Sequence, residues 1–290
     1  MTSPDDYLVD EEPSLAEQFE FVLRRQAELN GLFDRAQKPR ALARSRIAAD
    51  NQATSPVQLE HLVSYCLLQA IDCGRAMTRA VRAPDGSLEL PIMALYPLAR
   101  GQIECAAMAA WVMAPKLRRD RVLRRLQVGH DEISKEKALV VSAIGGRGDS
   151  EANKARRAEA VRERRRKSHL RAVAKANGID PGEYENTVPA WEARISEAGR
   201  ALGIPNDGLA VVWRLASGLS HPSLTRGTSV LDFTTVSEEG NVLSGVMSTK
   251  TESLTAVISL GERAARGALQ QWRVAKIQPN DEQPVPVVSF

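Results

Sequence analysis

Aromatic residues are scarce in this sequence, and so are cysteines. Phe, Trp and Tyr together make up 4% of the 290 residues, and there are three Cys and four His. Strands draw heavily on aromatic and β-branched residues, so this composition favours helices. A disulfide scaffold needs many cysteines, and a zinc site needs patterns such as C-x-x-C or H-x-x-x-H, which do not occur. We therefore expect reduced, buried thiols and neither a metal nor another cofactor.

Long hydrophobic runs are also absent. The most apolar stretches, about 90–99 and 105–115, are separated by Arg100 and Glu104, and each is too short to cross a bilayer about 30 Å thick. The first 13 residues hold five acidic side chains and no basic one, whereas a signal peptide starts with basic residues and continues with an apolar stretch. We therefore expect a cytoplasmic protein without a membrane segment, and a flexible acidic tail at residues 1–13.

What the sequence does contain is helical periodicity over most of its length. Only residues 228–248 are typical of strands, with β-branched residues on both sides of a Glu-Gly-Asn turn. We predict an all-α fold, a helical bundle with long antiparallel helices and one small β-hairpin near residues 228–248. Residues 14–278 should form this single helical domain, followed by a flexible tail at 279–290. The expected helices cover about 14–35, 55–81, 91–114, 115–144, 151–177, 189–202, 207–221 and 251–273.

The net charge of +3 hides an uneven distribution. Residues 115–175 contain 19 Lys or Arg against 8 Asp or Glu. We expect residues 115–177 to form a basic helical hairpin, and its second helix to project from the bundle because its apolar positions are mostly alanine. Such dense positive charge is typical of a surface that contacts nucleic acid. The run ERRRK supplies the candidate nucleic-acid-binding residues Arg162, Arg164, Arg165, Arg166 and Lys167.

This basic helix has an ordinary alternative. Charge runs usually form solvated helix faces, and no aromatic side chain interleaves with these cations to stack on bases. The sequence alone therefore leaves two interpretations open, an RNA partner and a solvated surface.

Two charged residues interrupt the most apolar helix. Arg100 and Glu104 lie four residues apart and so share one face. Burying charge costs free energy unless the charge is paired, and Arg before Glu is the weaker order for a pair within one helix, which points to partners on another helix. One interpretation is a functional site, and the other is a buried structural salt-bridge network.

A second constellation lies in the segment VWRLASGLSHPS. Arg214, Ser217 and His221 are spaced i, i+3 and i+7, which places a cation, a hydroxyl and an imidazole on one helix face. We expect Arg100, Glu104, Arg214 and His221 to lie in one cluster, because the charges of one helix need partners on another. The structural alternative is a His at the helix end that caps carbonyl groups, with Arg214 paired to Glu104.

Four pieces of the sequence carry a resemblance to known proteins: LLQAIDCGRAM, ARGQIECAAMAAWVM, the basic helix after Pro115, and WRLASGLSH. They span about residues 56–225 and resemble a group of bacterial helical proteins with R-x-x-x-E and W-R-x-x-S-G-x-x-H signatures. This group in turn is similar to the HEPN superfamily of α-helical bundles, many of whose members are metal-independent ribonucleases with an Arg, four to six residues, and then a His. Arg214 and His221 match this spacing with six residues between them.

The resemblance implies a metal-independent endoribonuclease or an RNA-binding component of a defence or toxin system. An RNA 2′-hydroxyl would attack the adjacent phosphate, with His221 as acid or base and Arg214 stabilising the phosphorane. Ser217 would assist, and Arg100 with Glu104 would hold the Arg and the His in place. A single His cannot readily act as both acid and base, so two copies would come together in the homodimer that the resemblance also implies.

The competing hypothesis is a non-catalytic helical module. It would bind a partner protein or a nucleic acid, and its cluster of Arg, Glu and His would be structural. The two hypotheses differ in one simple observation, which is whether His221 opens onto a solvent groove or is sealed inside the bundle.

Overall fold

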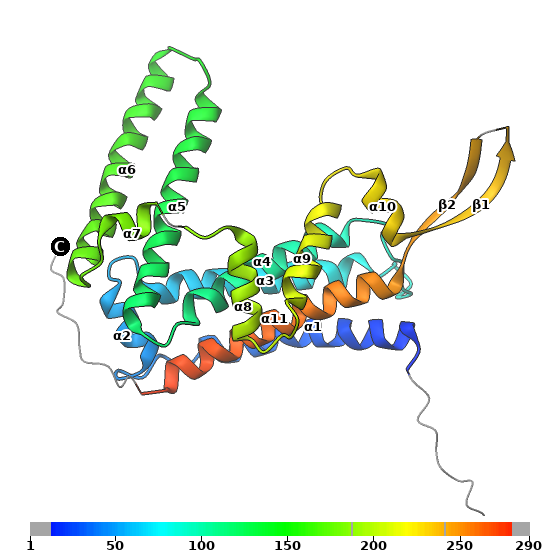
Figure 1. The fold of residues 1–290 in the computed structure, drawn as a ribbon, viewed down its shortest axis with the longest axis horizontal. Helices are drawn as coiled ribbons and strands as arrows, with labels where there is room; N and C mark the ends of the chain where they lie inside the picture. Colours follow the sequence, from blue (N-terminus) through cyan, green and yellow to red (C-terminus); the bar gives the residue numbers. More distant parts are fainter. Residues whose placement is uncertain (1–12, 187, 241, 280–290) are drawn as a thin grey trace, which may run out of the picture.

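The computed structural model describes residues 13–186, 188–240 and 242–279. Within these residues the protein is mostly helical, with eleven helices and one two-stranded antiparallel hairpin. The predicted fold class, all-α with a single small β-hairpin, is therefore confirmed. Figure 1 shows an elongated helical body with a pair of long helices rising from one end and the β-hairpin extending from the other.

Four long helices form the body: α1 (Leu15–Gln37), α3 (Leu59–Ala80), α4 (Leu95–Met113) and α11 (Thr251–Ile277). Helix α4 lies in the middle, where it packs most extensively against α3 and α11, while α1 packs against α11 and α3. It buries 13 of its 19 residues, as its nearly continuous apolar sequence predicted.

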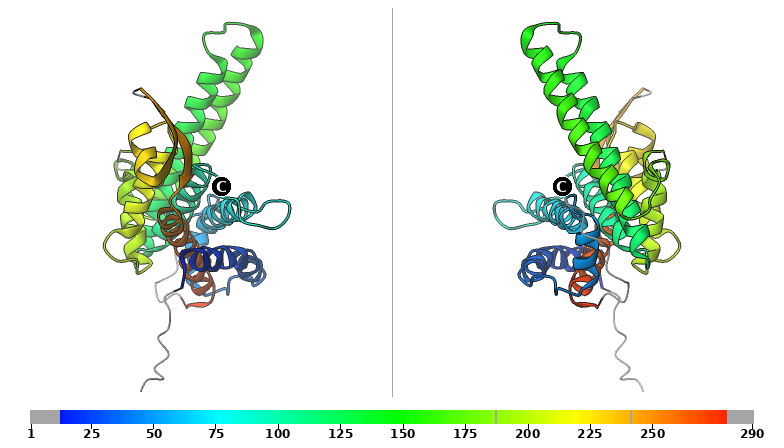
Figure 2. Two further views of the ribbon diagram at one scale, coloured as in Figure 1. Left: turned by 90° about the vertical axis from the view of Figure 1, so that its right-hand side faces the viewer. Right: turned by 90° about the vertical axis from the view of Figure 1, so that its left-hand side faces the viewer.

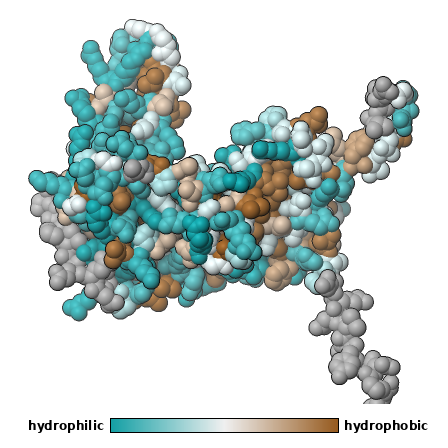
Figure 3. Space-filling model, viewed as in Figure 1, coloured by the Kyte–Doolittle hydropathy of each residue, from teal (hydrophilic) through white to brown (hydrophobic). Residues whose placement is uncertain are grey.

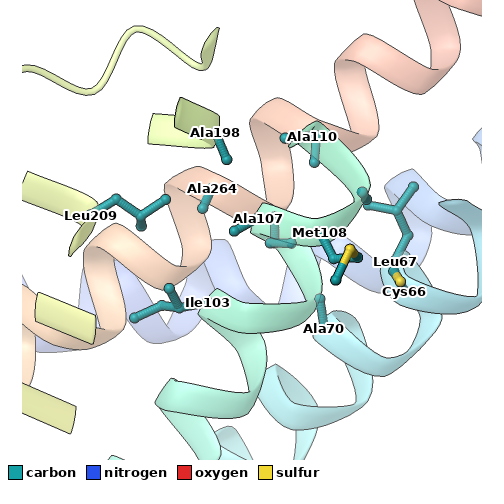
Figure 4. Packing of buried hydrophobic residues seen from close by; sticks show 14 of the residues in the cluster. Cys66, Leu67, Ala70, Ile103, Ala107, Met108, Ala110, Ala198, Leu209 and Ala264 are labelled. Carbon is teal, nitrogen blue, oxygen red and sulfur yellow. The ribbon is translucent and has the colours of Figure 1, made fainter. Parts of the chain in front are cut away.

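Small side chains allow this close packing around α4. In Figure 4, Ala107 and Ala110 of α4 lie close to Ala264 of α11. Leu67 of α3 and Ala198 of α8 (Trp191–Ala201) lie nearby. All five side chains are buried. Because alanine adds little bulk, neighbouring helices approach α4 from several sides, and larger residues fill the spaces between them.

A pair of amides lies at the centre of the body. Gln26 of α1 and Gln102 of α4 exchange two hydrogen bonds, with N–O distances of 2.8 and 2.7 Å, and both residues are almost fully buried. Gly74 of α3 and Gly261 of α11 border the pair, and a Cβ atom at either position would stand within 3 Å of an amide. The four helices thus meet around one satisfied polar contact.

The observed helix boundaries differ from the predictions in identifiable ways. Ser14 and Glu17 form the predicted capping box at the start of α1. Helix α3 starts at Leu59 and not at the expected Ser55–Pro56, because a short helix that the sequence analysis missed, α2 (Arg46–Ala53), comes just before it. Helix α4 starts at Leu95 and not near residue 91, which places Pro97 within its first turn, where a missing N–H is tolerated.

Helices α5 (Arg118–Ile144) and α6 (Ser150–Ala176) form an antiparallel pair that we call the arm. Each has 27 residues, or about 40 Å at 1.5 Å per residue. Figures 1 and 2 show the arm extending away from the body. A second hydrophobic cluster, separate from the core of the body, fills its base; its buried members are Ala53, Val122, Leu126, Ile133, Leu170, Val173, Ala174, Ile179 and Tyr184.

Short elements connect the arm to the β-hairpin: α7 (Pro181–Glu185), α8 (Trp191–Ala201), α9 (Gly208–Leu219) and α10 (Leu224–Val230). Strands β1 (Leu231–Glu239) and β2 (Val242–Thr249) then pair antiparallel before α11 begins. The first residues of the expected strand, 228–230, belong instead to α10.

Candidate functional site

The charged pair in α4 contacts α9 through a tryptophan. Arg100 Nε donates to Glu104 Oε1 at 2.8 Å, and Trp213 Nε1 of α9 donates to the same oxygen at 2.9 Å. The side chains of Arg100 and Glu104 are 29% and 20% exposed, so water still reaches both charges. The pair therefore satisfies itself within α4, despite its order along the helix, and its partner on the other helix is Trp213.

The remaining predicted catalytic residues lie on or beyond α9. Arg214 forms an exposed ion pair with Glu192 of α8, so its carboxylate partner is not Glu104. Ser217 is half-buried. Helix α9 ends at Leu219, two residues earlier than the sequence suggested, so His221 falls outside the helix.

His221 is exposed. Among the described residues its side chain makes no hydrogen bond or ion pair, so it caps no carbonyl of α9. The structure thus links Arg100 and Glu104 to α9 but leaves Arg214 in a separate ion pair and His221 facing solvent. The imidazole is therefore accessible to solvent.

The most deeply buried ion pair joins the arm to the body, and no sequence argument identified it. Arg121 Nε and Nη2 of α5 donate to the two carboxylate oxygens of Asp50 in α2 at 2.7 and 2.8 Å. Their side chains are 1% and 2% exposed. Arg121 Nη1 also donates to the backbone carbonyls of Pro115 and Lys116. Five other Lys or Arg stand between residues 116 and 125, and nothing in the sequence distinguishes Arg121 from them.

A second arginine contact strengthens the same junction. The Arg124 guanidinium lies 4.6 Å from the ring centroid of Trp111 and forms an ion pair with Glu197 of α8. The Trp111 Nε1 atom donates to Glu197 at 2.9 Å, and Arg194 lies 5.5 Å from the same ring. Arg121 and Arg124 of α5 therefore hold the arm against the body, and their guanidinium groups are already engaged in these contacts.

Helix α6 differs, because one of its sides carries cations without carboxylate partners. At 100° per residue, six basic positions fall within a sector of about 120° that lies opposite the side packed on α5. We call this the outer face of α6. Its residues are exposed and have no ion pair among the described residues: Lys154, Arg157, Arg164, Arg165, Arg171 and Lys175.

The run ERRRK does not act as one unit on this helix. Arg164 and Arg165 belong to the outer face. Arg162 instead pairs with the buried Glu159 at 2.8 Å, and Lys167 pairs with Glu163 at 2.7 Å. Arg166 is half-buried and lines a cavity at the base of the arm. Of the five predicted nucleic-acid-binding residues, the helix therefore presents only two on its free side, since consecutive residues point in different directions.

The thiols do not form a reactive centre. Cys66 is buried, and Cys73 and Cys105 are half-buried; all three are free. Burial raises the pKa of Cys66, and it raises the pKa of Cys105 to about 12, so these two thiols carry little thiolate at neutral pH. Within the described ranges, no group of three or more His, Cys, Asp or Glu side chains could hold a metal ion.

Comparison with known proteins adds no assignment. No family model, curated protein or solved structure matches the chain. In the described part of the chain, no helix combines the length and the apolar character that a membrane span requires.

Proposed function

We propose that this protein binds the phosphate backbone of a double-stranded nucleic acid through the outer face of α6. The observation that carries the proposal is the set of six exposed cations without carboxylate partners on one side of a projecting helix. Isolated exposed charges bring little stability. Phosphates, by contrast, bind such cations with release of counterions, which gives a favourable free energy.

The spacing of the arginines suits an extended polyanion. Arg157, Arg164 and Arg171 recur every seven residues, which places them about 10.5 Å apart in a nearly straight row. The row covers about 21 Å of a helix that is supported along its length by α5. A rigid line of positive charge can follow phosphates along a groove, where most protein contacts to a duplex are made with the backbone.

The composition of the arm favours a duplex over a single strand. Residues 118–176 contain no Phe, Tyr or Trp. Proteins that hold single strands usually stack bases on aromatic side chains, and this surface has none. The ligand is therefore expected to contribute its phosphates and not its bases, whether the duplex is RNA or DNA.

The test is a binding titration with the full chain. Fluorescence anisotropy should be measured with an RNA duplex, a DNA duplex and a single strand of the same length. The triple variant Arg157→Gln, Arg164→Gln, Arg171→Gln removes three charges from the outer face. The matched control, Arg40→Gln, Arg44→Gln, Arg273→Gln, removes three exposed charges that also lack ion pairs but lie on the body.

We expect the outer-face variant to lower the affinity for duplexes and to reduce the slope of log K against log salt by as much as about 2 to 3, since each lost phosphate contact contributes about 0.9 for DNA. The control should change affinity far less. Equal losses in both variants would show that only net charge matters, and salt-independent binding or a preference for single strands would contradict the proposal.

A second candidate function is RNA cleavage, favoured by the exposure of both His221 and Arg214. In this proposal His221 exchanges a proton with the 2′-hydroxyl or the leaving oxygen, and Arg214 neutralises the phosphorane charge. The Arg214 guanidinium forms an ion pair with the Glu192 carboxylate, so a phosphate must displace this carboxylate before it can bind Arg214. Ser217 and the Arg100–Glu104 pair would act only by positioning α9.

Cleavage is tested separately from binding. The purified chain is incubated with RNA in the presence of a chelator, beside the variants His221→Ala and Arg214→Ala. The proposal requires cleavage without divalent metal that both substitutions abolish. Binding without cleavage supports the module, whereas cleavage that needs magnesium or survives both substitutions contradicts this ribonuclease mechanism.

A further inference from the structure

The β-hairpin leaves both of its edges open. Strands β1 and β2 form a two-stranded sheet with no third strand among the described residues. The hairpin extends away from the helical body in Figures 1 and 2, and, in the part of the chain that the structure describes, α10 is the one helix with substantial contacts to β1. A two-stranded hairpin is marginally stable in water. Its backbone N–H and C=O groups along each outer edge are free to pair with another strand.

The two edges are not equivalent. Strand β1 carries the acidic residues Asp232, Glu238 and Glu239, and its register shifts between Thr235 and Ser237, which marks a bulge. Charges and bulges are the usual devices that prevent an edge from pairing. Strand β2 has the sequence VLSGVMST, without a charged residue or a proline. All of its residues pair consecutively, so the bulge lies on β1 and not on β2. The edge along β2 therefore lacks the protection that β1 has.

Apolar side chains accompany this open edge. Phe233 and Met247 are direct cross-strand partners on one side of the hairpin and are 47% and 45% exposed. On the other side, Val246 is 61% exposed opposite Thr234. In Figure 3, hydrophobic residues are visible on the part of the hairpin nearest the body. Such exposure costs hydrophobic free energy unless another surface covers it.

We propose that β2 is a dimerisation strand, which pairs antiparallel with β2 of a second copy of this chain. Antiparallel pairing of identical strands is two-fold symmetric, so the same edge serves both subunits. Because β2 has no charge, the pairing brings no like charges together. The same pairing through β1 would set acidic residues against one another. The result is a four-stranded sheet with the two β1 strands at its protected outer edges.

The test compares two substitutions that face each other across the hairpin. The two-fold axis stands perpendicular to the sheet, so both copies of residue 246 lie on the same face. With the axis near the middle of β2, they are directly opposite each other or two positions apart. Val246→Lys therefore places two ammonium groups side by side in the dimer. Thr234→Lys places the same charge on the same side of the hairpin but on β1, away from the new interface.

Sedimentation equilibrium of the full chain measures the effect. We expect wild-type protein to dimerise, Val246→Lys to raise the dimer Kd at least about tenfold, and Thr234→Lys to change it less than about twofold. Far-UV circular dichroism should show that both variants keep the helical fold. Hydrogen exchange of the amides on the outer edge of β2 should slow as the concentration of wild-type protein rises, whereas those on the outer edge of β1 should stay unprotected.

Three outcomes would overturn the proposal. Wild-type protein that stays monomeric at all accessible concentrations has no such interface. If both substitutions weakened the dimer equally, the subunits would contact each other through the face of the hairpin and not through its β2 edge. A dimer whose β2 amides remain unprotected would have its interface elsewhere, and β2 would then be open to a strand from a different protein.

Discussion

Helix α4 is enclosed by the rest of the molecule, whereas α6 is largely exposed to solvent. Helix α4 buries 13 of 19 residues, whereas α6 buries five of 27. The first owes its place to packing with several neighbours, and the second packs substantially against α5 alone. Side chains in α4 are therefore constrained by volume on nearly every side, while most of those in α6 remain in contact with water.

Arginine illustrates the same contrast. In α5, Arg121 and Arg124 lie between the arm and the body and make bidentate, ionic or ring contacts. In α6, Arg157, Arg164 and Arg171 face water without an ion pair among the described residues. One residue type thus fixes the arm at its base and provides its outer charge. Environment decides the role, because a guanidinium that loses water needs partners and one in water does not.

The largest effect is expected at the junction of the two regions. Asp50→Ala removes the carboxylate that pairs with Arg121 and leaves a buried, poorly compensated charge. The free energy of unfolding should therefore fall by about 3–5 kcal/mol. Urea denaturation followed by circular dichroism measures the change. The matched control is Arg119→Ala, which breaks an ion pair to Glu183 whose side chains are 46% and 36% exposed, and it should cost no more than about 1 kcal/mol.

If Asp50→Ala lowered the free energy of unfolding no more than Arg119→Ala does, water would reach the junction once the carboxylate is removed. The double variant Asp50→Leu, Arg121→Met sharpens the test, because it removes both charges together. It should recover part of the loss of Asp50→Ala, since the penalty comes mainly from the unpaired ion.

The sequence predicted the helices of the body because their apolar residues recur with helical period. It could not predict the Asp50–Arg121 pair, since α2 is too short to show a clear period and Arg121 stands in a run of similar cations. It correctly singled out Arg100 and Glu104 as charges in an apolar helix. Their partner Trp213 was missed, because an aromatic side chain in an apolar segment is ordinarily a core residue.

In the basic arm, the helical period separates cations that are consecutive in the sequence. A run of consecutive cations suggested ERRRK as a unit, but consecutive residues of a helix point in different directions. Grouping the cations by their angle around the helix selects Arg157 and Arg171 together with Arg164. Which side of α6 faces α5 depends on tertiary packing, and this could only be seen in the fold.

The second largest effect is expected at the centre of the body. Gly74→Ala would place a Cβ 2.4 Å from Gln26 Oε1 and 2.9 Å from Gln102 Nε2. The buried amides must then move or lose their hydrogen bonds, so we expect a destabilisation of about 1–3 kcal/mol by urea denaturation. The control is Gly227→Ala in α10, where nothing lies within 4 Å of the new Cβ and helix propensity should leave stability equal or slightly higher. Equal behaviour of the two variants would contradict a rigid amide pair.

A smaller effect is expected where α4 meets α9. Glu104→Ala removes the acceptor shared by Arg100 and Trp213, but both charged side chains retain contact with water. We therefore expect a loss of about 1–2 kcal/mol, below that of a fully buried pair. Glu104→Gln keeps an acceptor for Trp213 and should lose less. A loss as large as that of Asp50→Ala would mean that this site is effectively dry.

The smallest effect should come from the outer face of α6. Replacing Arg157, Arg164 and Arg171 by Gln changes three exposed side chains without ion pairs, and Gln has nearly the helix propensity of Arg. Stability should therefore stay within about 0.5 kcal/mol. In contrast, Leu170→Ala alters the residue next to Arg171, but its side chain is only 2% exposed in the cluster at the base of the arm, so about 2–5 kcal/mol should be lost. Leu170 and Arg171 are neighbours in sequence but lie on different sides of α6. A stability loss in the triple variant comparable to that of Leu170→Ala would therefore show that the outer cations support the fold. A loss of nucleic-acid affinity without a loss of stability would show that they serve a ligand.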